Sequence, residues 1–354
     1  YAHKNHQMNN YSARLLNFFL LLASIALVIL FLSLSKSLMV PLCWALVLSL
    51  MVLPVSRWFE KVVSNRALGV VLCIVLVFVF FLAILFLLSS QVVALTDEVP
   101  ELNEKFGRYI ADFRAYVEDR WNIPYGQQPE ELQKQLSEFL RSGLGLASAA
   151  VFGTVRMIAT IVTIPLFMFF MLNYRHRVVG FLERHYKKRD TSQVMGTMAK
   201  ITDAFQGYLS GLMLETLIVA IMVYVALLIL GIPHALLFGV FMAVMNLIPF
   251  IGVFIASTVA ILYVFLIKDP IIYPIVTLFV LWGIQIVENN FVKPYVVGDQ
   301  LHLNPFVIIL VVLFGGMMWG ASGMILFIPF LAALKIILHE IEPLEPWAYL
   351  LGDD

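Results

Sequence analysis

The amino-acid sequence predicts an all-α, polytopic integral membrane protein with about eight membrane segments, two of them broken or re-entrant helical hairpins. Three observations lead to this prediction. Hydrophobic residues make up 61% and charged residues 13% of the 354 residues, whereas soluble domains are about half apolar and about a quarter charged. The apolar residues form continuous runs of about twenty, the length of a membrane-spanning helix. The runs do not alternate with polar residues as the strands of a membrane β-barrel do.

The composition also excludes several classes of protein. A soluble protein of this size could not hide so much apolar surface, which excludes a soluble enzyme and a disordered chain. The 23 basic and 23 acidic residues cancel, so no net positive charge attracts nucleic acid. The sequence contains no motif for ATP binding or for hydrolytic catalysis, so we expect neither an enzyme nor a cofactor. Its His and Cys residues show no metal-ligand spacing, so no metal site is expected.

Six apolar segments have about the length that a membrane crossing requires: 15–35, 38–56, 67–95, 150–172, 208–231 and 271–288. Two further stretches, 234–267 and 304–338, are longer, and each is interrupted midway. As straight helices they would measure roughly 48 Å, which is long for one span. Each stretch either crosses once as a kinked, tilted helix or folds back as a re-entrant hairpin. The length favours hairpins.

Residues 96–149 differ from the rest of the chain because acidic and basic residues are frequent there. Thr96, followed by two acidic residues, is typical of a helix N-terminus, and apolar residues from Leu102 to Val117 recur at helical spacing. About fifty residues are too few for a strong independent core. We interpret this amphipathic segment as a structural spacer, with a gate or an oligomerisation element as the alternative.

Lysine and arginine predict the orientation, because cytoplasmic loops are enriched in them. They are found in the N-terminal tail, in the second loop and in the loop after the fourth span, while Lys36 alone occupies the first external loop. This distribution places both termini in the cytoplasm and residues 96–149 outside. The chain then divides into N-terminal membrane helices, the external segment, a fourth helix with a basic connector, a C-terminal core and an acidic tail, at 1–95, 96–149, 150–207, 208–341 and 342–354.

The two interrupted stretches carry the helix-breaking residues. Asn246, Pro249 and Gly252 lie in the middle of the first, and the second contains Gly315, Gly316 and Gly320, with Pro329 beyond them. Proline cannot donate its backbone hydrogen bond and glycine adds flexibility. Paired interrupted segments are typical of a transporter's substrate site, because unwound helix ends expose backbone dipoles to a cavity. We therefore expect the two breaks to line one site.

Two carboxylates lie at or near membrane depth, where ionisable groups are costly and mark functional sites. Glu215 lies inside the fifth span, and Glu288 ends the segment 271–288 on one helix face with Gln285 and Asn289. Glu288 is the first candidate for an ion or proton carrier, with an interfacial carboxylate near Lys293 as the alternative. Glu215 is the second candidate, with a helix-packing role as the alternative.

An ordered set of short motifs resembles the AI-2E (autoinducer-2 exporter-like) family of bacterial and archaeal transporters. They are Tyr208-Leu209-x-Gly211, Gly231-Ile232-Pro233-x-Ala235, Asn246-x-Ile248-Pro249-x-Ile251-Gly252, Gln285-x-x-Glu288-Asn289, Lys293-Pro294-x-x-x-Gly298, Asn304-Pro305, Phe314-Gly315-Gly316, Gly320, Gly323 and Ile328-Pro329. The resemblance implies a multi-pass transporter in the plasma (inner) membrane of a prokaryote. The resemblance implies that such a transporter exports a small polar solute or, in some members, exchanges sodium for protons.

The resemblance further implies a homo-oligomer such as a pentamer, with the lipid bilayer, the solute and H⁺ or Na⁺ as partners. The chain departs from the family pattern in one place. Relatives often carry a basic or amide side chain after Tyr208-Leu209, but this chain has Ser210 there and then Glu215. Three hypotheses stay open: a secondary transporter working by alternating access, a passive channel, and a membrane scaffold acting through residues 96–149.

Overall fold

The computed structural model describes residues 19–86 except 21 and 25, a few positions between 104 and 111, and residues 155–353 except 186–187, 250 and 299–300. This part of the chain is helical, and its only β-type pairing is an isolated antiparallel bridge between Leu303 and Gly352. Five of its helices are long and apolar enough to cross a membrane, which confirms an all-α polytopic membrane protein: Lys36–Val63, Arg66–Phe86, Thr191–Ile229, Ile272–Val296 and Ala321–His339.

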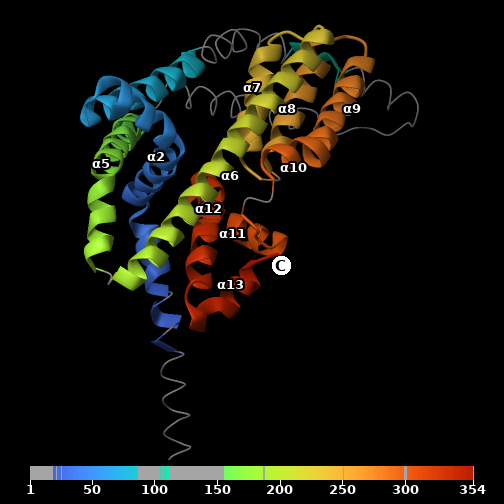
Figure 1. The fold of residues 1–354 in the computed structure, drawn as a ribbon. Coiled ribbons are helices and arrows are strands. Elements are labelled where there is room, and N and C mark those ends of the chain that lie inside the picture. The colour runs from blue at the N-terminus through green and yellow to red at the C-terminus, as the bar shows by residue number, and fades with distance from the viewer. Residues whose placement is uncertain are drawn as a thin grey trace, which may run out of the picture.

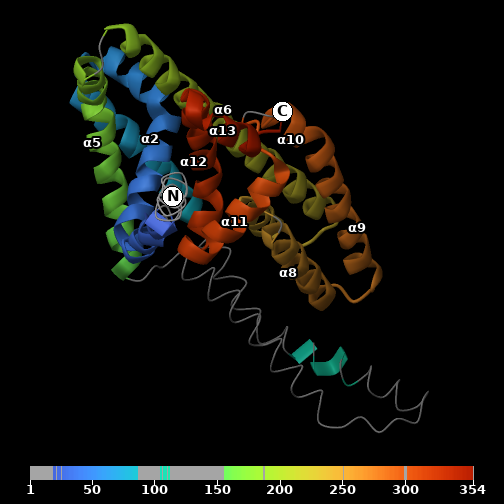
Figure 2. The same ribbon diagram turned by 90° about the horizontal axis from the view of Figure 1, so that it is seen from below.

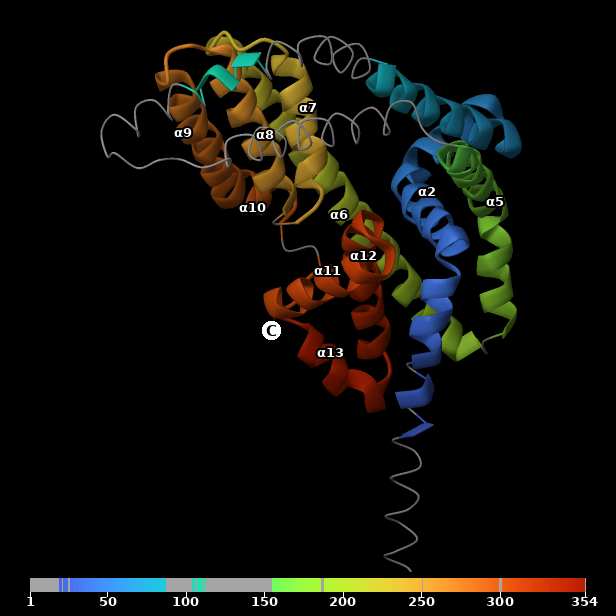
Figure 3. The ribbon, with the colours of Figure 1, turned by 180° about the vertical axis from the view of Figure 1, so that it is seen from behind.

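One long helix, α6 (Lys188–Ile229), runs diagonally through the molecule and contacts three groups of helices (Figure 1). The N-terminal group contains α2 (Lys36–Val63), the helix Arg66–Phe86 and α5 (Val155–His185). The second group contains α7 (Ala235–Asn246), α8 (Ile251–Ile267) and α9 (Ile272–Val287). The third contains α11 (Pro305–Trp319), α12 (Ala321–His339) and α13 (Glu345–Leu351). Figures 2 and 3 show that the N-terminal group and α9 lie on opposite sides of α6 and α12.

The expected external turn between the segments 15–35 and 38–56 is wrong. Ser35 alone separates the helix Leu22–Leu34 from α2, and Lys36 is the first residue of α2 rather than part of a loop. The Ser35 backbone N–H donates to the Phe31 carbonyl, and its hydroxyl donates to the same oxygen. With no Gly or Pro at this point and the hydrogen-bond ladder continued, the chain keeps its direction (Figure 3).

A bidentate ion pair joins α2 to α5. The Arg175 guanidinium donates from Nη1 and Nη2 to the two carboxylate oxygens of Glu60, at 2.6 and 2.7 Å. Ser56 donates to the same carboxylate, and the Arg66 guanidinium donates to the Leu172 carbonyl. Such a fork-to-fork pair fixes orientation as well as distance. Arg175, which the sequence marks only as a cytoplasmic charge, therefore holds the N-terminal group together.

The basic connector expected as a loop after the fourth span is also helical, because α5 continues to His185 and α6 begins at Lys188. The early part of α6 is fastened to the end of α12. The Lys200 ammonium lies 2.6 Å from a carboxylate oxygen of Glu340, and the Gln193 amide donates to the other oxygen. The Lys200 hydrogen bond holds the pKa of Glu340 below its usual value.

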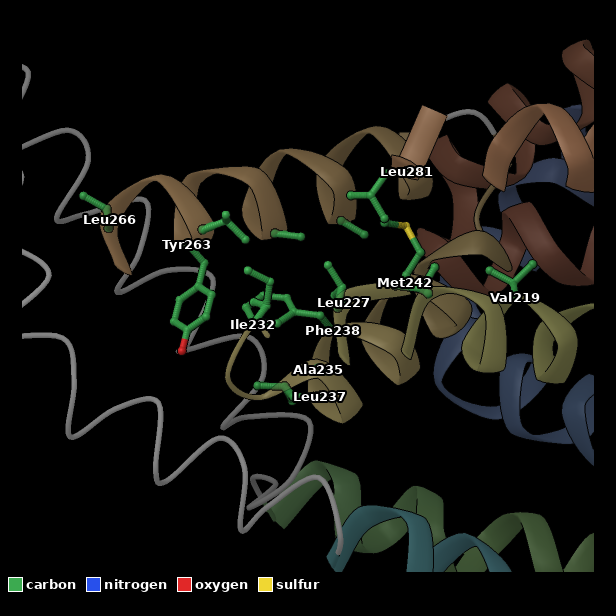
Figure 4. Packing of buried hydrophobic residues seen from close by; sticks show 14 residues of the cluster. Val219, Leu227, Ile232, Ala235, Leu237, Phe238, Met242, Tyr263, Leu266 and Leu281 are labelled. Atoms are coloured by element: carbon green, nitrogen blue, oxygen red, sulfur yellow. The ribbon is translucent and has the colours of Figure 1, made fainter. Parts of the chain in front are cut away.

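The stretch 234–267 forms a helical hairpin, not a single kinked crossing. Helix α7 ends at Asn246, α8 begins at Ile251, and Pro249 lies between them. The rings of Phe238 on α7 and Tyr263 on α8 are 4.7 Å apart, which requires the two helices to run antiparallel. Figure 4 shows this hairpin packed on α6 and α9 through a shared apolar core. Helices α7 and α8 thus pack against each other and together contribute to one apolar core with α6 and α9.

The stretch 304–338 forms a second hairpin, with the chain reversing at Gly320, whose φ is +62°. The helices approach very closely: a Cβ placed on Gly323 would lie 2.0 Å from the Gly315 carbonyl oxygen. Gly315 and Gly316 therefore lie inside α11, and Pro329 lies inside α12, not at the turn. Gly315 and Gly323 lack side chains because the opposite backbone occupies that space.

The acidic tail expected at 342–354 is an ordered element that returns to the rest of the chain. It forms the 3-10 turn Glu342–Leu344 and then α13, which packs along α12. The Asn304 N–H donates to the Leu351 carbonyl, next to the bridge between Leu303 and Gly352. This contact pins the linker that precedes α11 to the end of the chain.

Candidate functional site

The site lies in a helix that changes its winding. Helix α9 passes at Glu288 into a five-residue π-helix, Glu288–Val292, and then into α10 (Lys293–Val296), before Gly298 ends the element at φ +59°. Such wide turns are rare and are frequent at functional sites. Pro294 follows at once, and a wider turn relieves the clash that its ring makes with the preceding turn. Glu288 is thus the first residue of the irregular turn rather than the end of the helix.

The π-turn brings Lys293 to the same face as Glu288. In an α-helix, five residues rotate by about 500°, so the two side chains would point about 140° apart. In a π-helix, residues i and i+5 are linked directly. The Lys293 Nζ lies 3.3 Å from Glu288 Oε1. The sequence analysis did not place Lys293 in the site, because regular α-helical spacing puts it on a different face from Glu288. The signal that could have identified it is the five-residue interval between Glu288 and Lys293, directly before a proline.

The Glu288 carboxylate is held by amides from two elements. Asn246 Nδ2, at the end of α7, donates to Glu288 Oε1 at 2.7 Å, and Gln285 Nε2, one turn earlier on α9, donates to Oε2 at 3.0 Å. The Glu288 side chain is only 1% exposed. The break between α7 and α8 therefore contributes directly to the site, because the last residue of α7 binds the carboxylate.

Glu215 completes the cluster from α6. Its side chain is 2% exposed, and its Oε1 lies 3.5 Å from Lys293 Nζ, the same ammonium that approaches Glu288. In contrast to Glu288, this oxygen has no hydrogen-bond partner among the described residues. A buried, unsatisfied carboxylate oxygen is costly, and the cost points to a role beyond helix packing. Two carboxylates facing one ammonium leave the cluster one negative charge in excess when all three are ionised.

Gly211 on α6 allows α6 to contact the segment that follows the π-turn. A Cβ placed on Gly211 would lie 2.7 Å from the Val296 carbonyl oxygen and 2.8 Å from the Val297 Cα, so the backbone of α6 touches the segment that follows the π-turn. Gly211 lies one turn before Glu215 on the same helix face. The close contact at Gly211 therefore fixes the position of α6 against the segment after the π-turn, and with it the distance between the Glu215 carboxylate and Lys293.

The structure brings together part of the site expected from the sequence. Glu215, Asn246, Gln285 and Glu288 share one cluster, and Asn289 joins it because its Oδ1 accepts from Lys293 at 3.3 Å. Pro249 lies in the adjoining turn, and Gly252 lies at the start of α8. The glycines and the proline of the second stretch belong to the α11–α12 hairpin, and no contact in the described part of the chain joins them to the carboxylates: Gly315, Gly316, Gly320 and Pro329. Among the described residues, no group of three or more metal-ligating side chains gathers at one point.

Comparison with known proteins supplies a family context. The sequence pattern described as "AI-2E family transporter" matches residues 18–342. YueF of Bacillus subtilis, whose name describes a candidate transport protein, is 27% identical over 301 residues, which cover 81% of this chain and 80% of YueF. A second such protein of that organism, YrrI, is 25% identical over 312 residues and covers 86% of both chains. YhhT of Escherichia coli (strain K12), named in the same way, is 22% identical over 336 residues, 94% of this chain and 93% of YhhT.

Proposed function

The chain belongs to the AI-2E family of transporters, and on that basis we propose a secondary transporter that exports a small polar solute, driven by a proton or sodium gradient. The observation that carries the coupling is the buried cluster of two carboxylates and one ammonium beside the α7–α8 break. Protons and Na⁺ bind carboxylates, and buried acidic residues mark ion pathways in membrane proteins. The exporter direction rests on the resemblance to the family.

A sodium/proton antiporter is the second candidate. The cluster favours it because its two buried carboxylates, Glu215 and Glu288, supply the anionic oxygens that H⁺ and Na⁺ bind, and these oxygens already face one monovalent cation, the Lys293 ammonium. The named groups include no aromatic or apolar pocket for an organic solute. In this case the same carboxylates would carry Na⁺ in one direction and H⁺ in the other.

The test is a flux assay with the purified protein in proteoliposomes, under imposed sodium and proton gradients and with a panel of small polar solutes. Saturable uptake with counterflow supports the exporter. A sodium-dependent change of internal pH without solute movement supports the antiporter. Ion conductance without saturation would identify a channel, and no flux under any gradient would identify a scaffold. Glu183→Gln, an exposed carboxylate on α5 away from the cluster, is the matched control.

We further propose that the protein lies in the plasma (inner) membrane of a prokaryote as a homo-oligomer, with the C-terminus and the α5–α6 connector in the cytoplasm and residues 96–149 outside. The cytoplasmic N-terminus expected from the sequence depended on a turn at Ser35, where the chain keeps its direction. The basic residues of the α5–α6 connector support this orientation. A single cysteine at Gln127 should react with an impermeant thiol reagent added to intact cells. Labelling that needs an opened membrane would place the segment on the cytoplasmic side.

A further inference from the structure

We propose that the Lys293 ammonium is a tethered competitor of the transported ion: it occupies a monovalent-cation site formed by Glu215, Glu288 and Asn289, and the ion enters by displacing it. This inference rests on the proposed coupling function, and deepens it by assigning the occupant of the site. Its test is equilibrium binding without a gradient, so it can fail while transport stands, or stand while the solute stays unidentified.

Three oxygens converge on the ammonium at nearly equal distances. Lys293 Nζ lies 3.3 Å from Glu288 Oε1, 3.5 Å from Glu215 Oε1 and 3.3 Å from Asn289 Oδ1. Charge-assisted N–H···O bonds are usually about 2.7–2.9 Å long, and the ion pair of Lys200 with Glu340 in the same chain measures 2.6 Å. The Lys293 ammonium is therefore shared among these three oxygens, which we call the cage, rather than bound tightly to one carboxylate.

The exposed fractions of the three charged side chains indicate that Lys293, and not a carboxylate, can move out of the cluster. The Glu215 and Glu288 side chains are 2% and 1% exposed, whereas 44% of the Lys293 side chain is exposed. Glu288 is also fixed by the amides of Asn246 and Gln285. The flexible four-carbon stem of lysine can carry its charge out of the cage, while the two anions stay behind. A buried anion left alone is strongly disfavoured, so another cation must take the vacated position.

The chemistry of the cage selects the class of ion. The groups around the ammonium are carboxylate and amide oxygens, the ligands that hard cations prefer. A monovalent ion replaces the ammonium charge for charge, which leaves the excess of one negative charge unchanged. The Oε1 of Glu215 accepts no hydrogen bond from the described residues and is held only by the ion pair with Lys293 at 3.5 Å, so it can bind the ion once the ammonium leaves. Na⁺ fits this description and is the probe we choose.

The decisive experiment measures ²²Na⁺ binding to the purified full-length protein in detergent, with choline as the replacement cation. Removing the competitor in Lys293→Gln should tighten Na⁺ binding by about tenfold or more, because one unit charge no longer opposes entry. Lys293→Arg keeps the charge and should bind as weakly as the parent. Adding Glu215→Gln to Lys293→Gln should remove the gain, because it replaces one of the two anionic ligands with a neutral amide.

A second variant keeps the proposal testable if Lys293→Gln does not fold. Lys293→Cys, in a background with Cys43→Ser and Cys73→Ala, can be modified after purification. An aminoethyl thiosulfonate restores a positive charge and should weaken Na⁺ binding, whereas a methyl thiosulfonate adds bulk alone and should not. Unchanged or weaker Na⁺ binding in folded Lys293→Gln, or equal effects of the two reagents, would overturn the proposal and leave Lys293 as a structural counter-ion.

Discussion

Gradient-driven transport should be lost in Glu288→Gln, with solute exchange partly retained. The amide keeps the size of the side chain but removes one of the two negative charges that face Lys293. It also places a donor where Asn246 or Gln285 already donates, so one amide must turn away. The variant leaves one carboxylate facing one ammonium, so the cluster loses the excess negative charge that attracts a proton or Na⁺, and gradient-driven transport should fall to the level of protein-free liposomes.

Glu215→Gln separates the loss of charge from the loss of hydrogen bonds. Because Glu215 Oε1 has no hydrogen-bond partner in the described structure, an amide there disturbs little, yet it removes the same charge. We expect coupling to be lost to a similar extent, which differs from the sequence-based ranking that placed Glu288 well ahead. Both variants are compared with Glu183→Gln under proton and sodium gradients. Parental rates and parental pH dependence in both would exclude the pair as the coupling site.

Gly323→Ala should prevent stable folding of the α11–α12 hairpin. The added Cβ would lie 2.0 Å from the Gly315 carbonyl oxygen and 2.6 Å from its carbonyl carbon, so backbone rather than a flexible side chain must move. Overpacking costs about 1–3 kcal/mol and occasionally more, and a clash with backbone lies at the upper end of this range. Thermal unfolding in detergent, followed by size-exclusion chromatography, should show a lowered Tm and a smaller fraction of folded protein.

Two alanine substitutions serve as controls for that experiment. Gly316→Ala meets only the end of the Met324 side chain, whose Cε can swing aside, and Gly283→Ala meets no atom within 4 Å. Both should unfold near the parental temperature, and Gly283→Ala should gain a little from the better helix propensity of alanine. If Gly323→Ala unfolds at the same temperature as these two, the hairpin does not depend on the close approach.

The sequence predicts the helical membrane architecture, because apolar runs of sufficient length are visible residue by residue. It also favours two hairpins over single kinked crossings, since stretches of that length are long for one span. It does not show that Ser35 leaves the helix direction unchanged, because a serine between apolar runs is typical of both a turn and a continuous helix. The backbone hydrogen bonds that continue the helix through Ser35, from its N–H to Phe31 and from Met39 to its carbonyl, are visible only in the structure.

One member of the candidate site, Lys293, escaped prediction for a similar reason. The face shared by Gln285, Glu288 and Asn289 follows from regular spacing, but Lys293 joins only through the π-turn, which changes the period of the helix. Asn246 was identified as a polar residue at a break, yet its bond to Glu288 links elements 42 positions apart. The second break is the reversal at Gly320, whereas Gly315 lies inside α11 and packs on Gly323, a contact that becomes visible only when both helices are in place.

The shortness of the hairpin helices has a consequence for how the chain is made. Helix α7 has 12 residues and α11 has 15, roughly 18 and 22 Å of helix, against a hydrocarbon core of about 30 Å. Neither can be released into the bilayer alone when it leaves the ribosome, because its end would expose unpaired backbone to lipid. Helix α7 must therefore insert into the bilayer together with α8, and α11 together with α12. Biogenesis of the carboxylate cluster is therefore a late event, completed only after Lys293 has been synthesised and α9 can close over the hairpin.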